Sequence, residues 1–162
     1  MKKSVSLFLV LILCLSLCAC GLSEEEGKYV GTYTYNRNSK FVTYQIKTLE
    51  ATYSFVLDSD GTGNLTVKAE GSVSGHNPDT FHPYEIKKGD VLLEYELEWK
   101  VVDGYLVVDG TGKRYYTTNR SNTEIRDFGA EVIPITLSES YELKGNQLIR
   151  VADGQGWYTK ED

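Results

Sequence analysis

Apolar and charged residues alternate along residues 93–101 of the chain. The apolar positions are Leu93, Tyr95, Leu97, Trp99 and Val101, and the positions between them are Glu94, Glu96, Glu98 and Lys100. Because successive side chains of a β-strand point to opposite faces, this period of two predicts a strand with one face in a core and the other in water.

Short turn sequences separate this run from others like it. An Asp-Gly pair between two alternating runs is a strong hairpin signal, because glycine accepts the positive φ of a type I′ turn. Such pairs occur at 60–61, 103–104, 109–110 and 153–154, and Gly145-Asn146 is similar. The other strands are expected at Lys28–Tyr35, Ala51–Leu57, Asn64–Lys68, Tyr105–Val108, Lys113–Thr118, Tyr141–Lys144, Gln147–Val151 and Trp157–Lys160. This pattern predicts an all-β domain, an antiparallel meander of about eight strands that closes into a barrel.

Three stretches do not fit a simple meander. Residues 41–49 match the spacing of a short helix and also the alternation of a strand, so both readings remain open. Residues 71–83, which contain Asn77-Pro78, and residues 119–131 are predicted to be loops. Insertions of this kind are where a barrel usually carries variable function.

The first residues have the pattern of a secretory signal. Lys2 and Lys3 precede an apolar run at 5–17, which is too short for a permanent transmembrane helix. Leu17-Cys18-Ala19-Cys20 resembles the sorting box of bacterial lipoproteins, in which the peptide is cut before the cysteine and the thiol receives a diacylglyceryl group. The resemblance implies a signal peptide at 1–19, a lipidated Cys20 with a tether through residue 27, and a domain at 28–162. The alternative is an ordinary signal peptide in which Cys20 is incidental.

Cysteine content and charge narrow the classes of function. All three cysteines precede residue 21, so no disulfide, thiolate metal site or cysteine nucleophile is expected in the domain. Cleavage before Cys20 would leave 143 residues with 15 basic and 23 acidic side chains, a net charge of −8. Because this charge repels phosphate backbones, we expect no nucleic-acid partner. Two acyl chains hold a protein stably at a bilayer, so we expect the membrane to be a partner through the lipid alone.

Several segments resemble the lipocalin-like domain of bacterial lipoproteins. They are Gly31-Thr32-Tyr33, residues 53–63, residues 95–104, residues 141–150 and residues 157–160. The resemblance spans about residues 28–160, and its motifs are signatures of a fold. It implies a lipocalin-like β-barrel or a strongly curved meander, either of which can hold an apolar cavity, without implying a particular activity.

Four aromatic residues are the candidate ligand contacts: Tyr33, Tyr95, Trp99 and Trp157. Aromatic side chains on a concave sheet stack on sugars or line apolar pockets, although tyrosine at alternating strand positions more often fills a core. His76, Asp79 and His82 form a weak candidate metal site, because three ligands without a diagnostic spacing do not define one. The default expectation is two solvated loop histidines and no metal or other cofactor.

No pairing of a nucleophile with a base is found, so catalysis is not expected. The sequence leads to two hypotheses. The first is a lipid-anchored, extracytoplasmic, non-enzymatic module that binds a small apolar or amphipathic ligand or an envelope component. The second is an interaction protein with a solid core, whose loops at 71–83 and 119–131 engage another protein of the envelope.

Overall fold

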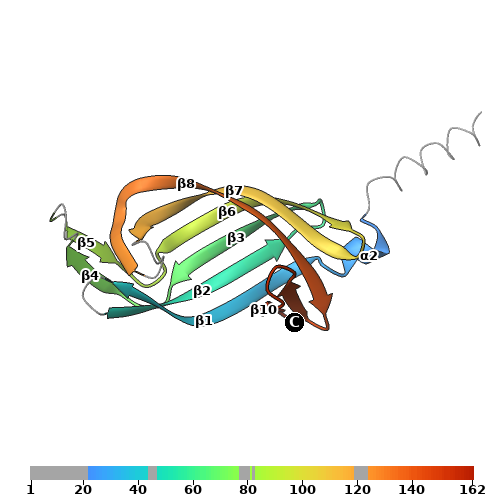
Figure 1. Ribbon diagram of the computed structural model, residues 1–162, viewed down its shortest axis with the longest axis horizontal. Helices are drawn as coiled ribbons and strands as arrows, with labels where there is room; N and C mark the ends of the chain where they lie inside the picture. The colour runs from blue at the N-terminus through green and yellow to red at the C-terminus, as the bar shows by residue number, and fades with distance from the viewer. Residues whose placement is uncertain (1–21, 44–46, 77–80, 82, 119–123) are drawn as a thin grey trace, which may run out of the picture.

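The computed structural model describes residues 22–43, 47–76, 81, 83–118 and 124–162, and most of them lie in β-strands (Figure 1). One short helix, α2 (Glu24–Gly27), precedes the first strand. The strands are β1 (Gly31–Thr43), β2 (Lys47–Leu57), β3 (Thr62–Ala69), β4 (Val73–His76), β5 (Pro83–Ile86), β6 (Val91–Val102), β7 (Tyr105–Thr118), β8 (Glu124–Lys144), β9 (Gln147–Arg150) and β10 (Gly156–Lys160).

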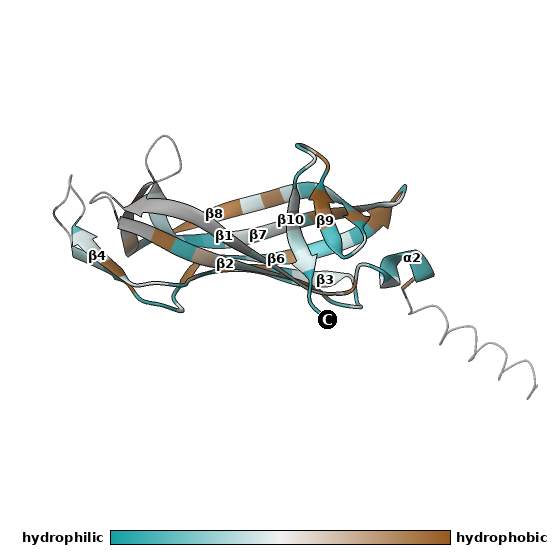
Figure 2. Cartoon of the chain, turned by 90° about the horizontal axis from the view of Figure 1, so that it is seen from below, coloured by the Kyte–Doolittle hydropathy of each residue, from teal (hydrophilic) through white to brown (hydrophobic). Residues whose placement is uncertain are grey.

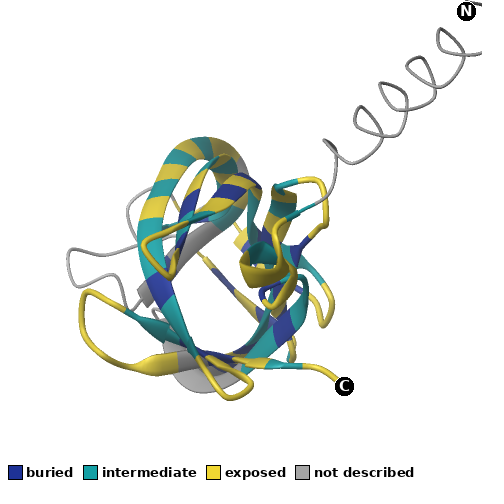
Figure 3. Cartoon of the chain, turned by 90° about the vertical axis from the view of Figure 1, so that its right-hand side faces the viewer, coloured by how far each residue is buried: buried dark blue, intermediate teal, exposed yellow. Residues whose placement is uncertain are grey.

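Eight of these strands form a closed barrel in the order β1-β10-β9-β8-β7-β6-β3-β2, with β2 beside β1 again. Figure 3 shows the ring of strands along the barrel axis, with α2 in front of it. The strands of the ring pair antiparallel, and an additional parallel pairing joins the end of β1 to the start of β8. The predicted all-β barrel of about eight strands is therefore confirmed.

Most of the predicted turns are confirmed, and one is wrong. The β6–β7 turn at Asp103-Gly104 has positive φ at both residues, 52° and 82°, as a type I′ turn requires. In contrast, β7 continues through Asp109-Gly110, where Gly110 pairs with Leu97 of β6 and Leu137 of β8. A single 14-residue strand therefore replaces the two strands expected at 105–118.

The two predicted loops contain strand structure. Within residues 71–83 the structure has β4 and the start of β5, which form a separate two-stranded hairpin. Within residues 119–131 the strand β8 begins at Glu124, and residues 119–123 lie outside the described part of the chain. The ambiguous stretch 41–49 is strand at both ends, since β1 ends at Thr43 and β2 begins at Lys47.

The buried side chains form two separate groups inside the barrel. The first cluster contains Tyr29, Tyr33, Phe55, Leu57, Leu65, Leu97, Trp99, Leu106, Val108, Tyr141, Leu148 and Tyr158. The second cluster contains Leu49, Ala51, Val67, Ala69, Val73, Tyr84, Ile86, Leu92, Tyr116 and Ile125. The two share no buried residue, and Tyr53 packs against both as a partly buried neighbour. Between them lies the middle of the barrel.

Three glycines lie where neighbouring strands of the sheet approach closely. A Cβ added to Gly110 would lie 2.5 Å from the carbonyl oxygen of Glu96 and 2.5 Å from Cδ2 of Leu97. A Cβ at Gly63 or Gly112 would also collide with the backbone of the adjacent strand. Glycine is therefore required at these positions for close approach of neighbouring strands rather than for a turn.

The N-terminal segment is fixed to one end of the barrel. The helix α2 begins with a capping box, in which the Ser23 side chain accepts a bond from the backbone of Glu26 and the Glu26 side chain accepts one from the backbone of Ser23. Leu22 packs against the first cluster, and the Tyr29 hydroxyl donates to the Gly104 carbonyl in the β6–β7 turn at 2.8 Å. Figure 2 shows α2 at one end of the elongated barrel and β4 at the other.

Candidate functional site

A band of inward-facing side chains lies between the two core clusters and is the candidate site. We call it the central belt and define it as Tyr35, Tyr53, Tyr95, Arg114, Ile133 and Ile135. The strand register places these residues in adjacent rows: Arg114 pairs with Leu93 and Ile133, and Tyr35 pairs with Tyr53. Each has the same parity as a buried residue of its own strand, for example Arg114 with Val108 and Ile135 with Tyr141. All six therefore face the interior.

Every side chain of the central belt is partly exposed, although it faces the inside of the barrel. Ile133 and Ile135 pack against neither of the two core clusters. A residue on the interior face becomes fully buried only where side chains from the opposite wall cover it. Solvent therefore reaches the interior at the central belt.

The strand pairing shows where this access arises. On its side away from β7, β8 pairs with β1 at Glu124 and Ile125 and with β9 at 141–144. Between these points, within the described residues, β8 has no strand partner on that side. On the facing strand, no described residue pairs with β1 from Tyr35 to Phe41 on the side away from β2. The hydrogen-bonded wall is interrupted alongside the belt.

An irregularity in β8 accompanies this interruption. Tyr116 and Arg114 of β7 lie two residues apart, whereas their β8 partners Phe128 and Ile133 lie five apart. The extra residues contain Gly129, with φ of 72°, and Val132, which is 50% exposed. Extra residues in one strand bend it, and Figure 1 shows β8 arching at the end of the barrel nearest to β4 and β5.

Aromatic rings extend from the central belt into the first cluster. The ring centroid of Tyr35 lies 5.9 Å from that of Tyr53 and 6.1 Å from that of Tyr158, and Phe55 lies 5.2 Å from Tyr158. These spacings are those of tilted and edge-to-face aromatic pairs. The wall of the belt on the side of β1, β2 and β10 is therefore a continuous aromatic surface.

The sequence-predicted aromatic residues fall in different surroundings. Tyr33 is fully buried, and its hydroxyl donates to the Tyr29 carbonyl at 2.8 Å. Trp99 is 6% exposed, and its Nε1 donates to the carbonyl of Thr62 at 2.7 Å beside the β2–β3 turn. Tyr95 lies in the central belt. The Trp157 side chain lies outside the described part of the structure. Only Tyr95 of the described three thus combines an inward direction with access to solvent.

Burial raises the pKa of the Tyr95 hydroxyl above its usual value, and the carboxylate of Glu139 acts in the same direction. The positive charge of Arg114 opposes both effects. The pKa of Tyr95 is therefore influenced by one inward-facing negative charge and one inward-facing positive charge.

The sequence analysis did not identify Arg114, Ile133 and Ile135 as site residues, because a turn was expected at 109–110 and a loop up to residue 131. Without a continuous β7, the face of the sheet to which these side chains point could not be assigned.

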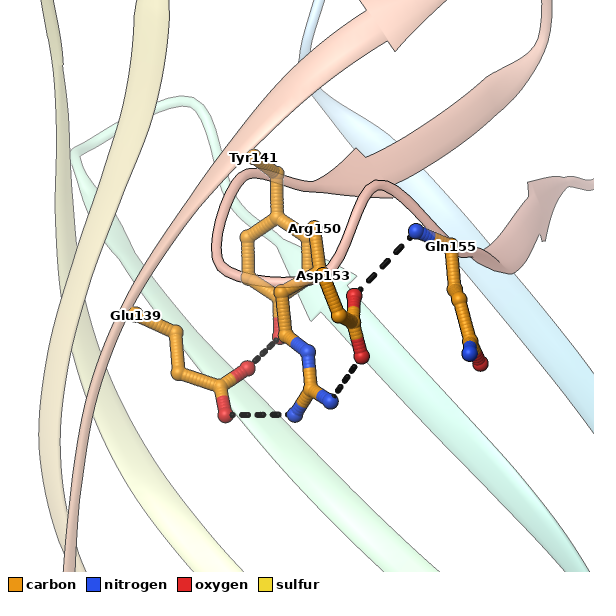
Figure 4. Close-up of polar contacts among 5 residues, drawn as sticks. All are labelled: Glu139, Tyr141, Arg150, Asp153 and Gln155. Atoms are coloured by element: carbon orange, nitrogen blue, oxygen red, sulfur yellow. Dashed lines mark hydrogen bonds and ion pairs between the residues drawn. The ribbon is translucent and has the colours of Figure 1, made fainter.

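A polar network closes the barrel on the side of β9 (Figure 4). The Arg150 guanidinium donates to Glu139 Oε1 at 3.1 Å and also contacts the carboxylate of Asp153. The Tyr141 hydroxyl donates to the other oxygen of Glu139, and Asp153 accepts a bond from the Gln155 backbone at 3.1 Å. Burial raises the pKa of Tyr141 above its usual range. These groups engage one another, so the network ties the β9–β10 hairpin to β8.

A shallow groove of about 800 Å³ runs over the outer face of β3, β6, β7 and β8. Glu96, Glu98 and Asp109 line it together with the hydroxyl groups of Thr111 and Thr136. The side chains of these five residues are exposed, as the alternation in β6 predicted for its acidic row. The groove was not predicted from the sequence, and its acidic groups are those of a solvated sheet face.

The candidate metal ligands are only partly within the described structure. His76 is the exposed last residue of β4, whereas Asp79 and His82 lie outside the described residues. Within the described ranges no group of three or more histidine, cysteine, aspartate or glutamate side chains is arranged to hold a metal ion. The same ranges contain no helix with the length and apolar character needed to span a membrane. Cys20 also lies outside them.

Comparison with protein-family models, with curated proteins and with solved structures finds no match for this chain. The fold and the side chains of the central belt are therefore the basis for any functional assignment.

Proposed function

We propose that the chain is a membrane-anchored, extracytoplasmic lipoprotein whose barrel is a non-enzymatic binding module for a small apolar or amphipathic ligand. The observation that carries the proposal is the partial exposure of Ile133, Ile135 and Tyr95, which face the interior between two packed clusters. Exposed apolar surface in a concave position is the usual character of a ligand site. The lipocalin-like resemblance of the sequence supports the same function.

The anchoring part of the proposal rests on the sorting box and on the position of the N-terminal segment. Leu22 and Tyr29 pack on one end of the barrel, two residues and nine residues after Cys20. A lipid on Cys20 would hold that end close to the bilayer. The β4–β5 hairpin, at the opposite end in Figure 1, would then point away from the membrane.

A neutral, apolar naphthylamine dye tests the binding site. We expect its fluorescence to rise on addition of the protein, and Ile135→Glu to abolish the rise by placing a charge in the belt. Thr136→Glu is the matched control, because Thr136 is the next residue of β8 and is exposed on the outer face. Equal loss in both variants, or no rise with the wild type, would refute a binding site in the belt.

Native mass spectrometry of the protein from its host would then identify a retained ligand. Additional mass of a few hundred daltons, absent from Ile135→Glu, would support the proposal. Retention of a protein partner without small-molecule mass would favour the second hypothesis, for which Phe81 is a suitable contact. Phe81 is 78% exposed between β4 and β5.

Lipidation has a separate test. We expect Cys20→Ala to release the protein from the membrane into the medium, because the lipid would be its stable attachment. Persistence of the variant in the membrane fraction, or a wild-type product without acyl mass on Cys20, would contradict the anchoring part and leave the binding part unaffected.

A further inference from the structure

Arg114 places a positive charge on the interior face of the barrel. Its neighbours across the sheet are Leu93 and Ile133, both apolar. Its Cζ lies 5.6 Å from the ring centroid of Tyr116, which is 6% exposed. The aliphatic stem and the guanidinium are therefore directed along the wall of the interior rather than toward bulk water.

The charge of Arg114 has no anionic partner among the side chains that the structure describes. Its Nε is buried and makes no hydrogen bond there. The ion pairs found in the described ranges join other residues, and the inward-facing carboxylate of Glu139 is bound by Arg150 and Tyr141 instead. The contact with the ring of Tyr116 is a cation–π interaction, which stabilises part of this charge but supplies no negatively charged oxygen.

A partly buried guanidinium without an acceptor is unfavourable, because it loses hydration without replacing the lost hydrogen bonds. A planar guanidinium suits a carboxylate or a phosphate, whose oxygen atoms accept two parallel hydrogen bonds. The net charge of the whole chain is negative, so Arg114 is an inward-facing cation in a predominantly acidic protein. The position favours an anionic oxygen group delivered by a ligand.

The apolar neighbours of Arg114 define the rest of such a ligand. Leu93 and Ile133 lie directly opposite Arg114 on the two neighbouring strands, and Ile135 is the next inward-facing residue after Ile133 on β8. All three are partly exposed. We propose that the ligand of the central belt is an anionic amphiphile, whose carboxylate or phosphate group is bound by Arg114 and whose hydrocarbon chain lies along these residues. This inference rests on the proposed function and names the chemical class of its ligand.

Calorimetric titration with three probes of equal chain length tests the inference: hexadecanoate, hexadecyl phosphate and hexadecanol. We expect the wild type to bind at least one of the two anions about tenfold or more tightly than the alcohol, as a charge-assisted pair contributes. The anion that binds with the higher affinity shows whether the preferred headgroup is a carboxylate or a phosphate. Equal affinity for the alcohol and both anions would overturn the inference while leaving the binding function intact.

Variants at position 114 test whether Arg114 causes the preference for the anions over the alcohol. Arg114→Met is expected to bind the anion as weakly as the alcohol, and Arg114→Lys to retain part of the preference. Lys113→Met is the control, since Lys113 is the exposed preceding residue on the outer face. Unchanged anion selectivity in Arg114→Met would overturn the inference. If none of the probes nor the naphthylamine dye binds the wild type, the proposed function itself fails. The comparison of probes on the wild type stands even if a variant does not fold.

Discussion

The first core cluster and the central belt both present aromatic and aliphatic residues on the same face of the sheet, yet only the cluster is closed. Tyr33 and Phe55 in the cluster are fully buried, whereas Tyr95 and Ile135 in the belt are partly exposed. Periodicity places all four inside the barrel. The difference comes from the opposite wall, which β9 and β10 complete beside the cluster and in which the described residues of β8 and β1 are not paired beside the belt.

Alkaline pH should unfold the closed parts of the barrel. Burial raises the pKa of Tyr33 to about 12 and that of Tyr116 to about 12, from 10.0. Between pH 10 and 12 the folded state thus holds protons that the unfolded state has lost, so stability falls as pH rises through this window. Together, the raised pKa values of these two tyrosines should lower the free energy of unfolding by roughly 5 kcal/mol at pH 12.

Urea unfolding at successive pH values, with tyrosinate absorbance as a second signal, measures this effect. We expect buried tyrosines to ionise together with unfolding. An unfolding free energy that stays constant from pH 10 to pH 12 would show that Tyr33 and Tyr116 are not buried in the two clusters as described.

Truncation of one side chain in each region sharpens the comparison. Phe55→Ala removes a fully buried ring whose centroid lies 5.8 Å from that of Tyr141, and should lower the free energy of unfolding by about 3–5 kcal/mol. Ile135→Ala should lower it by less than about 1.5 kcal/mol, because Ile135 packs against neither cluster. Chemical denaturation of both variants provides the measurement, and equal losses would mean that the belt is as tightly packed as the cluster.

The sequence predicted the face of each residue more reliably than the continuity of the strands. The alternation in β6 was confirmed at Leu97 and Trp99, which are buried, and at Glu96 and Glu98, which are exposed. Leu92 was missed, because a register shift opposite Val67 and Lys68 turns it inward as well. A bulge depends on the partner strand, so one strand's own pattern does not contain it.

The pair Asp109-Gly110 shows why local signals failed in the candidate site. Glycine at 104 provides a positive φ in a turn, whereas glycine at 110 provides space for the neighbouring strand. The same dipeptide serves both requirements, and only the tertiary arrangement distinguishes them. Once the turn was assumed, the inward direction of Arg114 and Ile133 could not be derived.

Substitution at Gly110 should affect the closed side of the barrel. The added methyl group of Gly110→Ala would collide with Glu96 and Leu97, so we expect a loss of about 1–3 kcal/mol in unfolding free energy. Gly27→Ala is the control, because a Cβ at the end of α2 meets nothing within 4 Å. Thermal and urea unfolding of both variants would decide the point, and an unchanged Gly110→Ala protein would contradict the close approach of β6 and β7.

The smallest expected effect concerns the network that fastens β9 to β8. Glu139→Gln removes the charge that Arg150 and Tyr141 share, and should lower the unfolding free energy by about 1 kcal/mol, since the side chains of Glu139 and Arg150 are 26% and 29% exposed.

A double-mutant cycle with Arg150→Met isolates the pair from other effects of each substitution. The salt bridge between Lys144 and Glu142 is a suitable comparison, because its partners are 61% and 44% exposed on the same strand. We expect measurable coupling for the first pair and none for the second. The same variants should also be tested with the neutral dye. If loss of the Glu139–Arg150 pair loosens the β9–β10 hairpin and lets the dye bind at the first cluster as it binds at the belt, then strand pairing, and not residue type, causes the difference between the two regions.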